Sequence, residues 1–268
     1  RFRRYWFEIS TKETNRDGQN ERKWTKYISG GGFRKWAGNE NYVVNWFKEG
    51  KEILNFRDGK GKLRSRPQNR DFYFLPSVCW SDIGSKPLGA RLNSGGKIFD
   101  VVSMSGFSND EPSRILLMAF LNSTVSNHFV RGLAPGMHYN TGYVSTLPYI
   151  EVLNEKADVV AKARELSELS LLDWSSRELS WDYSGTGLAL SAMSLKEGFE
   201  NFLEGVNERF FKIHRTEEEL NRIFIDIYGL QDELTPEVPL KDITILQEEL
   251  DSDDLEALEH EFRAGGGQ

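Results

Sequence analysis

The charge of the chain reverses near residue 150, and this asymmetry most limits how the chain can be organised. Residues 1–150 carry 23 Lys and Arg against 13 Asp and Glu, a net charge of +10, whereas the remainder carries 11 against 28, a net charge of −17. Such a division is typical of a basic contact surface joined to an acidic scaffold or tail. We place the boundary near Pro148 to Asn154, which predicts one domain over residues 1–150 and a second over 151–268.

The composition is that of a folded protein of the cytoplasm. Hydrophobic residues make up 38% of the 268 residues and charged residues 28%, which excludes a disordered or fibrous chain. The longest apolar run, Ile115 to Leu121, is far shorter than the ~20 residues that cross a bilayer, so we expect no membrane partner. A single cysteine, Cys79, suits a reducing compartment. Because the first residue is Arg1 and not Met, we expect a fragment of a longer protein.

The first half has the pattern of a mixed sheet with one helix. Short apolar stretches at 71–75 and 97–102 predict strands, separated by glycine-rich turns. Pro112 and the apolar face of Arg114 to Phe129 predict one buried helix. The fold class that follows is α+β: a mixed β-sheet domain followed by a mainly helical one.

The densest run of charge covers residues 57–70, which we call the basic loop. It contains one acidic residue, shows no hydrophobic periodicity and predicts a mobile loop. Its cations are spaced so that they would neutralise several phosphates, although composition alone is equally consistent with a solvated surface loop. The candidate phosphate contacts are Arg57, Lys60, Lys62, Arg64, Arg66 and Arg70.

A second candidate cluster combines glycines, cations and an aromatic residue within residues 26–36. Bare glycine backbone can approach a phosphate, and Arg34 and Lys35, with Arg91, are candidates to read bases or neighbouring phosphates. The alternative is a hairpin turn with Phe33 and Trp36 in the core, which we favour for these two aromatic residues. The segment lacks the spacing of a P-loop or a dinucleotide-binding loop. We likewise expect the tryptophans at 24, 46 and 80 to pack in the core.

The second half has helical periodicity. Apolar residues from Val152 to Leu169 predict a long amphipathic helix. Capping boxes predict further helix starts at Ser194 and Thr216, and Gly229 is a plausible stop for the second of these helices. The acidic run at 247–254 is more typical of a solvated face than of a contact surface, and a last short helix is expected over 255–262.

No motif for catalysis stands out. The four histidines lack metal-ligand spacing, and no nucleophile elbow or pair of carboxylates is present. We therefore predict no catalytic, metal or cofactor-binding residue in this chain. A hydrolase with a dispersed active site stays open as an alternative, because catalytic triads assemble from distant positions.

Eight short segments follow one another along the chain: residues 26–36, 45–46, 77–81, 99–100, 119–123, 147–149, 217–223 and 227–230. In this order they resemble a known family, the PglX-like adenine-specific DNA methyltransferases of BREX phage-exclusion systems. These enzymes are related to single-chain restriction–modification enzymes, and the resemblance is to their carboxy-terminal part. The stretch Phe120 to Ser123 and the later Leu147-Pro148 also look like target-recognition domains of type I specificity subunits. The resemblance covers about residues 20–250.

The resemblance implies an upstream catalytic domain that binds S-adenosylmethionine and methylates adenine at N6. This chain contains neither the Asn-Pro-Pro-Tyr tetrapeptide nor a glycine-rich S-adenosylmethionine motif. We therefore expect it to select the sequence in double-stranded DNA while the upstream methyltransferase domain does the chemistry. An alternative of a different class is a protein-interaction module whose acidic helices dock other defence-system proteins, with the basic half meeting its own catalytic domain.

Overall fold

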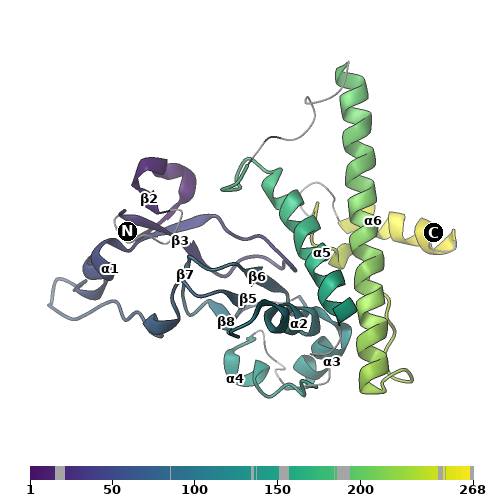
Figure 1. Ribbon diagram of the computed structural model, residues 1–268, viewed down its shortest axis with the longest axis horizontal. Coiled ribbons are helices and arrows are strands. Elements are labelled where there is room, and N and C mark those ends of the chain that lie inside the picture. The colour runs from purple at the N-terminus through teal and green to yellow at the C-terminus, as the bar shows by residue number, and fades with distance from the viewer. Residues whose placement is uncertain are drawn as a thin grey trace.

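The arrangement of strands and helices is that of an α+β protein, as predicted (Figure 1). The computed structural model describes residues 1–15, 22–84, 86–133, 136, 138–150, 157–183, 185, 194–246, 250 and 252–265. Two sheets occupy one side of the molecule in Figure 1, and the long helices of the second half occupy the other. The predicted domain boundary lies mostly outside the described residues.

The strands form one mixed sheet and one antiparallel sheet. The mixed sheet has the order β1-β4-β3-β2, and β7 pairs with β3 in parallel. The second sheet has the order β6-β5-β8. The strands are β1 (Arg3–Tyr5), β2 (Thr14–Asn15), β3 (Trp24–Ile28), β4 (Tyr42–Asn45), β5 (Ser77–Ser81), β6 (Ala90–Asn93), β7 (Ile98–Phe99) and β8 (Ser103–Gly106).

Helices follow the sheets in the chain and cover the smaller sheet. Helix α2 packs on β5, on β6 and on α5, and α5 in turn packs on α6. The α-helices are α1 (Phe47–Leu54), α2 (Glu111–Asn122), α3 (Thr124–Leu133), α4 (Thr141–Val144), α5 (Ala157–Ser175), α6 (Leu195–Tyr228) and α7 (Ser252–Ala264). Short 3₁₀ segments are η1 (Trp6–Glu8), η2 (Thr11–Glu13), η3 (Arg70–Phe72) and η5 (Leu240–Asp242).

The largest hydrophobic cluster crosses the predicted boundary between the halves. It joins Trp36 and Trp80 of the first half to Leu166 of α5, Phe224 of α6 and Ile243 after η5. Trp24, Trp36, Trp46 and Trp80 are all buried, which confirms that they pack in the core, while Phe33 is half-buried. The two halves therefore share one core, and the division into two domains stays a prediction.

The predicted strand over residues 71–75 is wrong, and the one over 97–102 is shorter than expected. Residues 70–72 form η3, and Phe74 has a φ of 68°, outside the strand region. Only Ile98 and Phe99 pair with a neighbouring strand. Both stretches are apolar because they pack against the mixed sheet, in a cluster that includes Tyr73 and Ile98.

The single helix predicted from Pro112 to Phe129 is broken at Ser123 into α2 and α3. Ser123 has an extended backbone, and its Oγ accepts a hydrogen bond from Ser126 N at 3.1 Å at the start of α3. The preceding Asn122 accepts from Ala90 N at 2.7 Å and donates to Ala90 O at 3.0 Å. At the break, the amide side chain of Asn122 therefore satisfies both the backbone N–H and the backbone C=O of Ala90 in β6.

Helix α6 confirms one predicted start and contradicts the other. Ser194 Oγ accepts from Glu197 N at 3.1 Å, so the predicted cap at Ser194 is confirmed. Gly229, with a φ of 65°, ends the helix as predicted. No helix begins at Thr216, because α6 runs through it without interruption, and Thr216 and Glu217 are buried. A short last helix is confirmed as α7.

Candidate nucleic-acid interface

The six candidate cations of the basic loop lie on the surface at the end of the molecule opposite α7 (Figure 1). All six residues are exposed. Of the six, Arg64 alone has an ion-pair partner within the described part of the chain, Asp58 at 2.9 Å. The remaining charges face water and are available to an anionic ligand.

The basic loop has a defined turn where sequence predicted a mobile segment. Asp58 Oδ1 accepts hydrogen bonds from the backbone N–H groups of Lys60 and Lys62, both at 2.9 Å. Asp58 N donates to Lys62 O at 2.9 Å, and Arg64 N donates to Phe56 O at 2.8 Å. The one carboxylate of the loop therefore closes the turn that presents its cations.

A cavity of about 700 Å³ lies between the second half of the basic loop and the mixed sheet. Arg64 and Arg66 border it on the loop side. The opposite wall is aromatic: Phe107 lies 4.9 Å from Phe72 and 5.8 Å from Phe99, measured between ring centroids. Cations beside aromatic rings are the combination that binds phosphate and stacks bases.

One carboxylate, Asp100, also lines this cavity, and its oxygens are already engaged. Tyr27 Oη donates to Asp100 Oδ2 at 2.7 Å, and Oδ1 accepts from the backbone N–H groups of Val102 and Ser103. Burial and the neighbouring Asp100 raise the pKa of Tyr27 well above its ordinary value. The phenol is therefore neutral at physiological pH and acts as a donor that holds Asp100 in place.

Sequence reasoning overlooked two amide side chains in the same loop. Gln68 and Asn69 are exposed and line the cavity beside Arg66. Amides of this kind make paired hydrogen bonds with adenine in the major groove. The signal was present in the sequence, as polar uncharged residues inside a cationic run.

Arg70 ends the loop beside a buried tryptophan. Its guanidinium carbon lies 5.9 Å from the Trp46 ring centroid. This contact, on the outer side of the loop, orients the arginine without neutralising it.

Arg34 and Lys35 are not on the accessible surface, and the expectation that they face DNA needs correction. Both residues are 5% exposed. Arg34 Nη2 lies 2.7 Å from Asp173 Oδ2 of α5. Burial lowers the pKa of the Arg34 guanidinium, and Asp173 opposes that decrease. The charge of Arg34 therefore holds the glycine-rich segment to the helical half.

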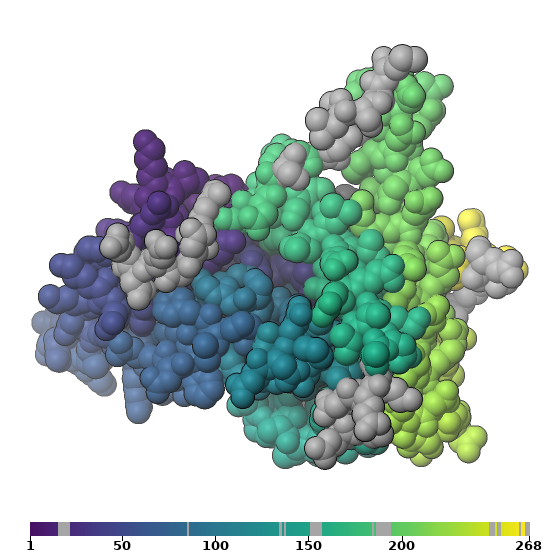
Figure 2. All heavy atoms as spheres, in the orientation of Figure 1, coloured from purple at the N-terminus to yellow at the C-terminus, as the bar shows by residue number. Residues whose placement is uncertain are grey.

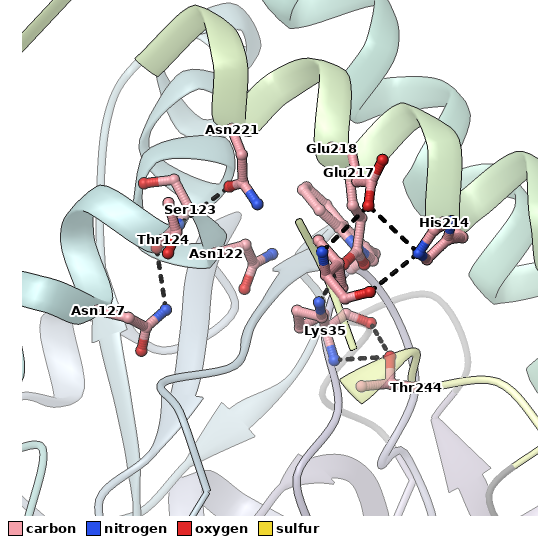
Figure 3. A network of polar contacts seen from close by, with 12 residues as sticks. Lys35, Asn122, Ser123, Thr124, Asn127, His214, Glu217, Glu218, Asn221 and Thr244 are labelled. Atoms are coloured by element: carbon pink, nitrogen blue, oxygen red, sulfur yellow. Dashed lines mark hydrogen bonds and ion pairs between the residues drawn. The ribbon is translucent and has the colours of Figure 1, made fainter. Parts of the chain in front are cut away.

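Lys35 takes part in a polar network between the glycine-rich segment and α6 (Figure 3). Its Nζ forms an ion pair with Glu217, and Trp36 Nε1 donates to the other oxygen of the same carboxylate at 2.6 Å. The backbone N–H of Lys35 also donates to Thr244 Oγ1 at 3.1 Å. Glu217, the residue after the helix start predicted at Thr216, lies inside α6 and binds the first half of the chain.

Arg91 is also buried, with 2% of its surface exposed, so it does not present its charge on an open surface. It lies in β6 and lines a smaller pocket of about 180 Å³ together with Gly31 and Gly32. Of the nine predicted contact residues, the structure brings the six of the basic loop together and places the other three in the interior.

Among the described residues, no group of three or more His, Cys, Asp or Glu side chains is placed to hold a metal ion. Within the same part of the chain, no helix is both long enough and apolar enough to cross a membrane.

The chain is similar to part of two adenine-specific methyltransferases. It is 36% identical over 265 residues to adenine-specific methyltransferase PglX of Lacticaseibacillus casei (strain Zhang), covering 94% of this chain and 22% of that protein. It is 28% identical over 236 residues to adenine-specific methyltransferase BrxX of Escherichia coli O9:H4 (strain HS), covering 87% of this chain and 19% of that protein. No family model matches. The chain thus spans about a fifth of the length of the curated relatives it matches.

Proposed function

We propose that this chain is the DNA target-recognition part of an adenine-specific DNA methyltransferase of a BREX-type phage-defence system. The basic loop and the aromatic cavity beside it carry this proposal. Exposed cations without ion-pair partners bind phosphates and release counterions, which favours association with a duplex. Similarity to methyltransferases named adenine-specific supports DNA as the ligand.

In this proposal different residues of the basic loop have different roles. Lys60, Lys62 and Arg66 hold the phosphate backbone and set the register of the protein on the duplex. Gln68 and Asn69, next to them, contact base edges. Phosphate contacts give affinity without sequence preference, so sequence choice depends on the amides and on the shape of the groove.

The methyl-transfer chemistry is assigned to another part of the longer protein. This chain has no Asn-Pro-Pro-Tyr tetrapeptide and no glycine-rich S-adenosylmethionine motif. We therefore propose that S-adenosylmethionine and the target adenine are bound by a methyltransferase domain, and that this chain positions the duplex for it.

The salt dependence of duplex binding tests the role of the basic loop. Replacing Lys60, Lys62 and Arg66 by glutamine removes three phosphate contacts, so the slope of log K against log salt should flatten by about three units. The measurement is fluorescence anisotropy of a labelled duplex at several salt concentrations. A slope equal to that of the wild type would remove the loop from the interface.

A matched control separates local contact from overall charge. Replacing Lys196, Lys212 and Lys241 by glutamine changes the net charge by the same amount, but these lysines lie on or beside the helices of the second half. If the basic loop is the interface, the control keeps the wild-type slope. Equal flattening in both variants would show a long-range effect of charge and contradict the proposal.

A separate variant tests base reading. Gln68→Ala should lower discrimination between the preferred sequence and its single-base variants by about 1–3 kcal/mol at one position, with little change in the salt slope. Binding selections on randomised duplexes would identify that position. Unchanged preference at every position would exclude Gln68 as a base-reading residue.

A second candidate function, docking of other protein regions, is favoured by an apolar surface on α6. Leu195, Phe199 and Leu203 are 78%, 51% and 42% exposed. Figure 2 shows this end of α6 standing out from the body of the molecule. A cavity of about 670 Å³ beside it is lined by residues of α5, α6 and α7. Exposed apolar patches of this kind mark contact surfaces.

Co-purification tests this candidate. The methyltransferase region of the longer protein, expressed as a separate chain, should be retained by the wild-type chain and lost with Leu203→Glu. Exposed Leu171→Glu on α5 serves as the control for an added charge. Equal retention by all three proteins would contradict a docking role for α6.

A further inference from the structure

Arg91 is a buried cation that forms no ion pair with any residue that the structure describes. Its Nη1 donates to Arg34 O at 3.4 Å, and its side chain also contacts the thiol of Cys79, which lies opposite it on β5. Within the described part of the chain, no oxygen accepts a hydrogen bond from Nε or Nη2. Asp173, which pairs with Arg34, also lies 3.6 Å from Arg177, so this carboxylate is already shared by two arginines. A buried charge without a partner is strongly unfavourable, so an anion that reaches Arg91 would stabilise the protein.

The 180 Å³ pocket that Arg91 lines has the character of an anion site. Arg34 and Lys86 line it as well, and no described residue of its lining is acidic. Arg34 is neutralised by Asp173, and the Lys86 ammonium lies 3.9 Å from Asp242. The excess positive charge inside the pocket therefore belongs to Arg91.

Glycine backbone forms much of the pocket and opens it to solvent. Gly31, Gly32, Gly84 and Gly89 all line it. Ser81 Oγ fixes the loop by accepting from Gly31 N and donating to Gly31 O, both at 3.1 Å. Gly31, Gly32 and Lys86 are exposed, so a ligand can enter between them. Glycines allow an oxyanion to approach the main chain closely.

We propose that this pocket binds a phosphate group, with Arg91 as its buried cation, Lys86 at the entrance and the backbone of the glycine-rich segment around it. The pocket is small, which suits one tetrahedral oxyanion and not a nucleobase. The phosphate belongs either to a DNA backbone, in which case the inference deepens the proposed function, or to a free phosphate compound. A DNA phosphate held here would place the glycine-rich segment against the duplex.

The first experiment uses the chain alone with inorganic phosphate, so it does not depend on DNA binding. The melting temperature is measured in phosphate and in chloride at equal ionic strength and pH. A ligand present at 100 times its Kd should raise the melting temperature of the wild type by about 5 °C. If the melting temperature does not increase at the highest phosphate concentration that the assay allows, the proposed site is wrong.

Two variants assign the effect to the pocket. Arg91→Met should abolish the increase, and because it removes an unpaired buried charge it should not lower the stability in chloride. Gly32→Val keeps the arginine and adds a side chain at the entrance, where nothing lies within 4 Å of the new Cβ. It should weaken the response to phosphate at least tenfold. Gly132→Val on α3, also with nothing within 4 Å, is the control and should respond as the wild type does. Equal responses in all four proteins would place the phosphate elsewhere.

Duplex binding distinguishes the two sources of the phosphate. If DNA supplies it, Arg91→Met flattens the salt slope by about one unit, and inorganic phosphate competes with DNA more strongly than chloride does at equal ionic strength. If the ligand is free, the melting response persists while the slope stays that of the wild type. The two proposals can fail separately. If the Lys60, Lys62 and Arg66 variant flattens the salt slope but phosphate does not raise the melting temperature of the wild type, the proposed function stands and this site is rejected.

Discussion

Replacing Asp173 by asparagine tests whether buried charge joins the two halves of the chain. Asp173 Oδ2 lies 2.7 Å from Arg34 Nη2, and the two side chains are only 3% and 5% exposed. The substitution preserves the shape of the side chain but leaves a buried guanidinium without a countercharge. Breaking a buried pair in this way lowers the free energy of unfolding by about 3–5 kcal/mol.

Urea denaturation measures the effect. With an m value of about 3 kcal/mol/M, the midpoint should fall by at least ~1 M urea. Since the pair is screened from solvent, the loss should be nearly the same at low and at high salt. The double variant Arg34→Met with Asp173→Leu should recover much of the stability, because the buried Arg34 charge is removed together with its partner.

A surface pair provides the control. Lys162 and Glu219 form an ion pair between α5 and α6 with side chains 32% and 47% exposed. Glu219→Gln should therefore change the free energy of unfolding by no more than about 1 kcal/mol, and less at high salt. If Asp173→Asn were as mild as Glu219→Gln, the argument that Arg34 is a structural cation would be refuted.

Three further substitutions test local features of the fold by urea denaturation. Asn122→Ala removes both hydrogen bonds to Ala90 and should lower the free energy of unfolding by about 1–3 kcal/mol; a neutral result would mean that water replaces the amide. Ser194→Ala removes the cap of α6 and should lower the free energy of unfolding by about 1 kcal/mol. An unchanged free energy of unfolding would mean that the first turn is already frayed. Gly229→Ala forces a residue with a Cβ to adopt a backbone φ of 65° and should lower the free energy of unfolding by about 1–2 kcal/mol. An increase in stability would contradict the left-handed cap.

Features that depend on neighbouring residues in the chain were predictable. The cap at Ser194 and the stop at Gly229 are local patterns, because a hydroxyl or a bare α-carbon satisfies the helix end within a few residues. The α+β class and the burial of Trp36 and Trp80 follow from periodicity and composition. The exposure of the basic loop was also predictable, since a charged segment without apolar spacing has nothing to bury.

Predictions failed where a distant residue decided the outcome. Apolar residues 71–75 pack as an irregular segment because the mixed sheet lies beneath them. Thr216 does not start a helix because α6 runs through it, where the neighbouring Glu217 binds Lys35 and Trp36. Residues 114–129 contain no proline or glycine that would mark a break at Ser123, and the extended backbone of that residue is known only from the structure.

The sequence by itself determined that the chain has a basic half that contains strands and an acidic half of helices, since charge and period can be counted along the chain. Only the tertiary structure decided which cations are available. Arg34 meets Asp173 across 139 positions and Lys35 meets Glu217 across 182, whereas Arg91 is enclosed without a carboxylate partner among the described residues. Charge is a property of each residue, but its exposure and its partner depend on which distant segments the fold brings together.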